Sequence, residues 1–214
     1  MRGVFITFEG GEGSGKTTQI ERLSSFITEH FPGISTCLTR EPGGTETGEH
    51  IRTLLVNGAA DRWQPPSEAM MMSAARHEHI VQVIRPALEA KQVVICDRFA
   101  DSTYVYQGFV GGVDTGLLDS LTRLSCDGLT PDITFFLDLN SADGLARAAQ
   151  RGVGEDRFEA KGAEFHERVR EGFLQRAIAE PERIKRIDAS RTVDDVAAEI
   201  AGHIKTLFAV RDIG

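Results

Sequence analysis

Residues 4–18, VFITFEGGEGSGKTT, decide the fold of this chain. The stretch contains the pattern G-x-x-x-x-G-K-[ST], which begins at Gly10 and ends at Thr17. The apolar, β-branched run Val4–Glu9 before it predicts a buried strand, and the apolar residues that recur at helical spacing after it predict a helix. A glycine-rich turn at a helix N-terminus points backbone N–H groups and the positive end of the helix dipole at one place. The stretch therefore predicts a phosphate-binding loop.

The residues of this loop have distinct predicted roles toward a nucleoside triphosphate. Lys16 is expected to reach the β- and γ-phosphates, and the hydroxyl of Thr17 is expected to hold Mg²⁺. The predicted triphosphate-binding residues of the loop are Gly10, Gly11, Glu12, Gly13, Ser14, Gly15, Lys16, Thr17 and Thr18. The alternative interpretation is a glycine-rich turn with an exposed lysine, which would not require a strand and a helix on either side.

Length and composition narrow the class of protein. A chain of 214 residues suits one α/β domain with a small mobile insert. The net charge of −8 argues against a general nucleic-acid binder. The opening MRGVFITFEG is itself a predicted strand, so we expect no signal peptide, and the absence of an apolar run of about 18 residues predicts no membrane span. The three cysteines fit no metal-binding pattern and are expected to be reduced, as in the cytoplasm.

Short apolar strands alternate with helical patterns along the whole chain. The predicted strands are Val4–Glu9, Ile34–Thr39, Val93–Asp97, Ile133–Leu139 and Ile184–Asp188. Ser67 is the expected N-cap of a long helix that runs to about Lys91. After Asp97 we expect a polar loop, followed by a helical pattern at Thr115–Cys126. This alternation predicts an α/β fold of the three-layer P-loop NTPase type, with a five-stranded parallel sheet and helices on both faces. Ligands of such a sheet bind beyond the C-terminal ends of the strands.

A second group of polar residues lies in CDRFADSTYVYQG, residues 96–108. Asp97 ends an apolar strand, where a carboxylate can bind Mg²⁺ directly or through water, and Arg98 could clamp a phosphate. Thr103 and Gln107 are four residues apart, so on a helical turn they would face the same way and could read the edge of a base. A surface Asp–Arg pair and ordinary surface polar residues remain alternatives at this point.

Several motifs, in order along nearly the whole chain, resemble bacterial thymidylate kinases, the dTMP kinases of the P-loop nucleoside monophosphate kinase group. They are FEGGEGSGKTT, TREPGGTETGEHIRTLL, AARHEH, DRFADSTYVYQG and DRFE. The resemblance implies a single kinase domain, residues 1–214, with a lid segment at about 148–161. It implies transfer of the γ-phosphate of ATP to dTMP, giving dTDP for dTTP synthesis. It also implies a Mg²⁺-dependent, cytoplasmic enzyme that is a homodimer.

The resemblance assigns roles to individual residues. It places Glu12 near the sugar and phosphate of the acceptor, Arg98 on the acceptor phosphate and Arg76 on the thymine. The full set of dTMP-binding residues that it implies is Glu12, Glu41, Pro42, Arg52, Met72, Arg76, Arg98, Thr103 and Gln107. On the ATP side it adds Arg147, Ser190 and Arg191 to the loop, and the metal-binding residues are Thr17 and Asp97.

The lid motif is similar to the bacterial type that supplies arginines from the lid. Other members carry a catalytic arginine in the phosphate-binding loop, where this chain has Glu12. Arg147 and Arg151 share one helix face, and Arg157 follows in GEDRFE. Positioned arginines stabilise the charge on a transferring phosphoryl group. The predicted catalytic residues are Lys16, Arg98, Arg151, Arg157 and Glu12.

One departure from the family pattern concerns the base. An aromatic residue usually stacks on thymine four residues before the Arg76 position, and this chain has Met72 there. Met70 and Met71 are expected to be core residues. A kinase for another pyrimidine or deoxynucleoside monophosphate is the nearest alternative. A GTPase switch lacks support because the chain has no N-K-x-D motif, and a non-catalytic ATP-binding relative is disfavoured by the complete set of loop and Asp97–Arg98 residues.

Overall fold

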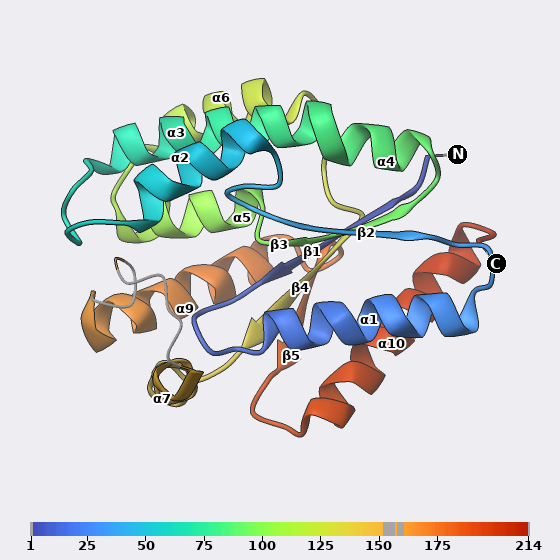
Figure 1. Ribbon diagram of the computed structural model, residues 1–214. Coiled ribbons are helices and arrows are strands. Elements are labelled where there is room, and N and C mark those ends of the chain that lie inside the picture. Colours follow the sequence, from blue (N-terminus) through green and yellow to red (C-terminus); the bar gives the residue numbers. More distant parts are fainter. Residues whose placement is uncertain (1, 152–156, 158–160, 214) are drawn as a thin grey trace.

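The computed structural model describes residues 2–151, 157 and 161–213, and its centre is a parallel five-stranded sheet (Figure 1). The strand order is β2-β3-β1-β4-β5. The strands are β1 (Val4–Glu9), β2 (Thr36–Arg40), β3 (Val93–Asp97), β4 (Ile133–Asp138) and β5 (Ile184–Asp188). The predicted fold class is confirmed, and β2 begins two residues later than the apolar pattern predicts.

Helical elements cover both faces of the sheet. In the described residues they are α1 (Lys16–His30), α2 (Glu46–Val56), α3 (Pro65–His79), the π-helical η1 (Ile80–Ile84), α4 (Arg85–Glu89), α5 (Ala100–Thr103), the π-helical η2 (Tyr104–Val110), α6 (Thr115–Cys126), α7 (Ser141–Arg151), α9 (Gly162–Ala179) and α10 (Val193–Val210). Helices α1 and α10 lie together on one face, and the helices from α2 to α6, with α9, lie on the other (Figure 1). None of the helices in the described ranges has the length and apolar character needed to cross a membrane.

The central strand β1 is buried along its whole length because both of its faces are covered. Val4, Ile6 and Phe8 pack in the core beneath α1 and α10. Phe5 points to the opposite face, where its ring meets that of Phe99 edge-on at 4.9 Å. Because β1 is buried along its whole length, core packing fixes the position of its C-terminal end, where the phosphate-binding loop begins.

The segment after Asp97 is helical where the sequence pattern predicts a polar loop. It forms α5 and η2, and the buried carboxylate of Glu9 holds its start. Glu9 Oε1 accepts hydrogen bonds from the backbone N–H groups of Phe99 (2.9 Å) and Ser102 (3.2 Å), and Oε2 accepts one from the Ser102 hydroxyl (2.6 Å). The last residue of β1 thus accepts hydrogen bonds from N–H groups at the N-terminus of α5.

Two local expectations about α3 are wrong. The helix begins at Pro65 with Gln64 before it, and Ser67 is therefore inside the first turn rather than its N-cap. Proline is suited to the first helical position, where its missing N–H costs nothing. Met70, expected in the core, is 50% exposed on the outer side of α3.

The lid segment predicted at 148–161 is only partly described. Residues 152–156 and 158–160, and the side chain of Arg151, lie outside the described part of the structure. The helix that leads into this predicted segment, α7, packs with its backbone directly against the phosphate-binding loop. A Cβ on Gly13 would lie 2.0 Å from the carbonyl oxygen of Gly144, and a Cβ on Gly144 would lie 2.4 Å from that of Glu12.

The contact between Gly13 and Gly144 predicts a difference between two glycine-to-alanine substitutions in helices. Gly202→Ala in α10 meets no atom within 4 Å, so it should stabilise the protein by about 0.5–1 kcal/mol through helix propensity. Gly144→Ala gains the same propensity but forces α7 off the loop, which should cost about 1–3 kcal/mol net. Urea unfolding of both variants measures the difference, and equal effects would contradict the backbone contact.

The burial of Glu9 predicts a pH dependence of stability. Burial, with the nearby charge of Asp101, raises the pKa of Glu9 from 4.5 to about 7. The folded state therefore binds this proton more tightly than the unfolded state. The resulting stabilisation is complete below about pH 4.5 and is lost as the pH rises through about 7, to an extent of about 3 kcal/mol.

Replacement of Glu9 by the uncharged isostere glutamine tests this dependence. The free energy of unfolding of the wild type, minus that of Glu9→Gln, should fall as the pH rises from about 4.5 to 8. Chemical denaturation across this range measures the difference. Parallel pH profiles for the two proteins would show that Glu9 does not titrate as described.

Candidate active site

The phosphate-binding loop has the geometry of an anion cradle. Gly10, Gly13 and Gly15 adopt positive φ angles, which turn the backbone sharply into α1. Lys16 folds back over the loop, and its Nζ donates to the carbonyl oxygens of Gly10 (3.3 Å) and Gly11 (3.1 Å). Burial lowers the pKa of this ammonium. A triphosphate in the loop would offer Lys16 stronger acceptors than two carbonyl groups.

A groove beside the loop is lined by residues of the predicted ATP side. Arg147 of α7 and Arg191 line it together with Gly13, Gly15 and Thr18. Arg147 donates a hydrogen bond to the backbone oxygen of Ala189 at 3.3 Å. The predicted residue Ser190 is not among the lining residues, and its hydroxyl is bonded to Asp188 at 2.6 Å. The structure therefore brings Arg147 and Arg191, but not the side chain of Ser190, to this groove.

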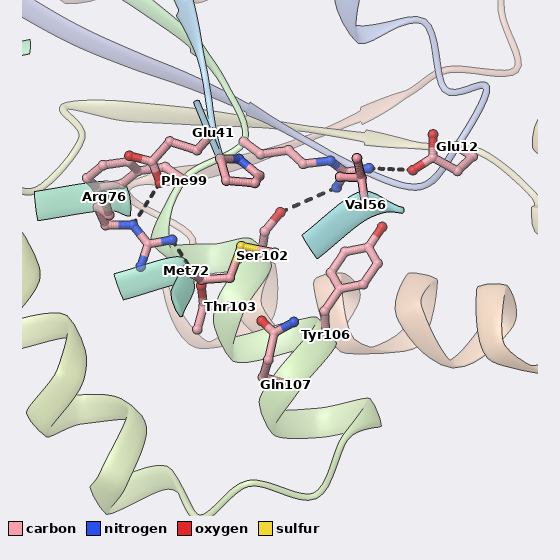
Figure 2. A pocket seen from close by; sticks show the side chains of 12 residues that line it. Glu12, Glu41, Val56, Met72, Arg76, Phe99, Ser102, Thr103, Tyr106 and Gln107 are labelled. Atoms are coloured by element: carbon pink, nitrogen blue, oxygen red, sulfur yellow. Dashed lines mark hydrogen bonds and ion pairs between the residues drawn. The ribbon is translucent and has the colours of Figure 1, made fainter. Parts of the chain in front are cut away.

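A second pocket lies on the other side of the loop, between Glu12 and the helices α3, α5 and η2 (Figure 2). Its lining includes all the predicted acceptor residues except Arg52: Glu12, Glu41, Pro42, Met72, Arg76, Arg98, Thr103 and Gln107. Arg52 lies behind Pro42, to whose carbonyl oxygen it donates a hydrogen bond at 2.8 Å. In Figure 2, Arg76 and Glu12 mark opposite ends of the pocket.

One end of the pocket carries a paired arginine. Arg98 has a φ of +66°, which turns its side chain from the end of β3 toward the loop. Its Nη2 donates to Glu12 Oε1 at 2.8 Å, and its guanidinium lies over the ring of Tyr106 at 5.2 Å. Burial alone would raise the pKa of Glu12, but the positive charges of Arg98 and Lys16 outweigh it and lower the pKa. Arg98 gives this end of the pocket a cation that can bind a phosphate.

The other end of the pocket carries a rigid arginine suited to a neutral ring. Arg76 is only 2% exposed. Its Nε donates to Glu41 Oε2 at 2.8 Å, and its Nη2 donates to the Thr103 hydroxyl at 2.9 Å. Glu41 is also bonded to His79 Nδ1 at 3.1 Å. The Glu41 carboxylate therefore both neutralises and orients Arg76.

Four lining residues were missed in the sequence: Val56, Phe99, Ser102 and Tyr106. Three of them lie in the segment that was interpreted as a polar loop. Together with Thr103 and Gln107, positions 99, 102 and 106 follow the three- and four-residue spacing of one helix face. A helical interpretation of that segment would have identified them. Met72, the substitute for an aromatic residue, does line the pocket.

Asp97 has the features of a ligand for a hard cation. It ends β3 beside β1, and its Oδ1 is buried without a hydrogen-bond partner among the described residues. Thr17 is exposed at the start of α1. The described residues contain no cluster of three or more His, Cys, Asp or Glu side chains that could hold a metal by themselves. One carboxylate and one hydroxyl fit Mg²⁺, which usually takes its other ligands from phosphates and water.

The predicted catalytic lid arginines are not both visible at the loop. Arg151 is the last residue of α7, and its side chain lies outside the described part of the structure. Arg157 is 1% exposed and donates to the carbonyl oxygens of Leu55 (2.7 Å) and Ala59 (3.2 Å). Its Nη2 also lies 2.5 Å from Glu68 Oε2. The structure thus places Arg157 against α2 and α3 rather than on the phosphate-binding loop.

Comparisons with known proteins point to one family. A family model for thymidylate kinase matches residues 8–200. A thymidylate kinase of Caulobacter vibrioides is 50% identical over 200 residues, which cover 94% of this chain and 95% of that protein. A thymidylate kinase of Magnetococcus marinus is 48% identical over 210 residues, covering 98% and 99% of the two chains.

A solved structure agrees as well. The crystal structure of thymidylate kinase from Ehrlichia chaffeensis superposes with a TM-score of 0.77 at 37% identity, covering 97% of this chain and 100% of that one. The family model and the identity to these relatives over nearly their whole length show that the chain belongs to the thymidylate kinase family.

Proposed function

We propose the following division of roles for the transfer of the γ-phosphate of ATP to dTMP, the reaction that gives dTDP. The observation that carries it is the position of Arg98, which contacts Glu12 of the phosphate-binding loop and also lines the pocket that ends at Arg76. One cation thus lies where a donor and an acceptor phosphate would meet. Catalysis is then a matter of positioning and charge neutralisation, because the acceptor phosphate is itself the nucleophile.

On the donor side, the loop residues 10–18 hold the triphosphate. Lys16 moves from the carbonyl groups of Gly10 and Gly11 to the phosphates. Arg147 and Arg191 border the groove where the nucleoside of ATP would lie. Thr17 and Asp97 would hold Mg²⁺, which when bound neutralises charge on the phosphates. The buried, unpaired Oδ1 of Asp97 supports this assignment.

On the acceptor side, Arg98 binds the phosphate of dTMP, and Glu12 keeps that arginine in place before the substrate arrives. Arg76, fixed by Glu41, donates to a carbonyl of the base, and Thr103 and Gln107 border the base edge. Met72 forms the wall over the ring. Pro42 closes the pocket beside Glu41, and Arg52 adds positive charge behind it.

The two predicted lid arginines, Arg151 and Arg157, have different proposed roles. Arg151, at the end of α7 and next to the undescribed lid residues, supplies charge to the transferring phosphoryl group when the lid closes. Arg157, predicted to act beside it, is held on the acceptor side in the described conformation. Its contribution to transfer therefore requires the lid to release it.

We also propose that the enzyme is a cytoplasmic homodimer. Apolar side chains on η1 and α6 support the dimer, since Val81 and Leu124 are 51% and 68% exposed. The cysteines Cys37, Cys96 and Cys126 are all free thiols, as expected in a reducing compartment.

Arg98→Ala should affect the use of dTMP, and Lys16→Met should affect the use of ATP. Loss of the Arg98 clamp should cost roughly 2–4 kcal/mol of transition-state stabilisation and weaken dTMP binding, with little change in ATP affinity. Lys16→Met should lower turnover about a thousandfold or more while dTMP still binds. Equilibrium titration with each nucleotide, combined with a coupled assay of ADP release, separates the two.

The two variants also control for each other. If Arg98→Ala abolishes ATP binding and leaves dTMP binding intact, Arg98 has been assigned to the wrong substrate. Near-normal turnover of folded Lys16→Met would refute the triphosphate role of the loop.

Met72→Phe and Met72→Asp test whether this side chain is the wall over the base. A phenyl ring should keep dTMP binding or strengthen it by about 0.5–1.5 kcal/mol, because it offers a rigid flat surface. An aspartate beside the base should raise the KM for dTMP sharply and leave the KM for ATP unchanged.

Met70→Phe and Met70→Asp are matched controls, because Met70 lies on the same helix but is half exposed on its outer side. They should leave both KM values unchanged. If Met72→Phe destabilises the protein without a specific effect on dTMP, Met72 acts as core packing.

A further inference from the structure

A buried carboxylate in the first turn of α3 is used by neither the donor nor the acceptor roles described above. Glu68 is 5% exposed and does not line the acceptor pocket. Its Oε1 accepts a hydrogen bond from Gln107 Nε2 at 2.6 Å, and its Oε2 lies 2.5 Å from the guanidinium of Arg157. Burying a carboxylate is costly unless it is paired, so two strong partners at one site call for an explanation.

The first consequence concerns the direction of the Gln107 amide. An ionised carboxylate can only accept hydrogen bonds, so it requires the NH₂ group of Gln107 to face it. The amide oxygen is then turned to the other side. Gln107 is 2% exposed and lines the pocket, and Figure 2 shows its amide end directed between Thr103 and Tyr106. Within the described residues, no hydrogen bond reaches Gln107 Oε1.

The second consequence concerns Arg157. In the described conformation, the carbonyl oxygens of Leu55 and Ala59 accept hydrogen bonds from its other N–H groups, which fixes the guanidinium against Glu68. The ion pair with this buried cation holds the Glu68 carboxylate in place, so that its other oxygen faces the Gln107 amide. Arg157 therefore maintains the condition under which Glu68 orients Gln107.

An amide that is held in one orientation can distinguish pyrimidine bases by the group at ring position 3. Thymine and uracil carry an N–H at ring position 3, whereas cytosine has a lone pair there. An amide oxygen that faces this position accepts a hydrogen bond from thymine or uracil. With cytosine, the amide oxygen would face another acceptor and no hydrogen bond could form. A site built for one hydrogen-bonding pattern rejects a ligand that leaves its buried groups unpaired.

We propose that Glu68 is a specificity-determining positioning residue, which holds Gln107 as an acceptor and so selects acceptor bases that carry an N–H at ring position 3. This inference rests on the acceptor pocket of the proposed function. It goes beyond that function because Glu68 contacts no substrate and acts only through Gln107.

The test is Glu68→Gln, which keeps the shape of the side chain but can donate as well as accept, so that Gln107 is free to turn over. Steady-state kcat/KM is measured with dTMP, dUMP and dCMP at saturating ATP. The ratio of dTMP to dCMP should fall about tenfold or more. The ratio of dTMP to dUMP should stay unchanged, since both bases carry the N–H.

The chain offers a matched control. Glu78, also on α3, pairs with Gln82 on the surface, outside the pocket. Glu78→Gln repeats the same chemical change there and should leave all three values unchanged. Gln107→Ala supplies the second control, because Glu68→Gln in that background should cause no further change in the ratio of dTMP to dCMP.

The possible outcomes separate the hypotheses. Glu68 is not a specificity residue if Glu68→Gln lowers both ratios equally, leaves the ratio of dTMP to dCMP within about twofold, or retains its full effect in the Gln107→Ala background. If Glu68→Gln alone fails to fold because Arg157 is left unpaired, Glu68→Gln combined with Arg157→Met removes both charges and must show the same fall. Wild-type protein that does not phosphorylate dTMP would instead refute the proposed function.

Discussion

The hydrogen bonds from the start of α5 to the Glu9 carboxylate are the interaction on which the rest of the site depends. Glu9 is the last residue of β1, one position before the phosphate-binding loop, and it fixes Phe99 and Ser102 of the acceptor side. Asp101, in the same turn, is held from the opposite direction by Arg176 and Arg183. Two buried carboxylates thus set the distance between the part of the molecule that binds ATP and the part that binds dTMP.

Most of the framework could be predicted from the sequence because its signals are local. Apolar β-branched runs such as Val93–Asp97 favour a buried strand by their length and composition, and the glycine and lysine spacing of the loop is typical of a phosphate-binding turn. The motif resemblance added the acceptor residues, and all of them except Arg52 line one pocket. Their proposed individual roles await the substitutions described above.

What could not be predicted depends on contacts between distant parts of the chain. Ser102 looks like an ordinary polar residue until Glu9, 93 positions earlier, is seen to bind it. Arg157 carries the motif of a lid arginine, yet its hydrogen bonds go to Leu55, 102 positions away. Neither the π-helical form of Tyr104–Val110 nor the outward position of Met70 is encoded in a local pattern. Such features are decided by tertiary packing, which overrides propensity.

The close backbone contact between Gly13 and Gly144 gives α7 a fixed point against the phosphate-binding loop, about which the helix could tilt. At about 1.5 Å of rise per residue, Arg147 lies roughly 4.5 Å beyond Gly144 along α7, and Arg151 lies roughly 10 Å beyond it. Any tilt of the helix about that point therefore moves Arg151 more than twice as far as Arg147. In the proposed lid movement, a rigid α7 would keep Arg147 at the groove beside the loop and would carry Arg151 in and out. A helix that tilts about its contact with the phosphate-binding loop needs no hinge within its own length.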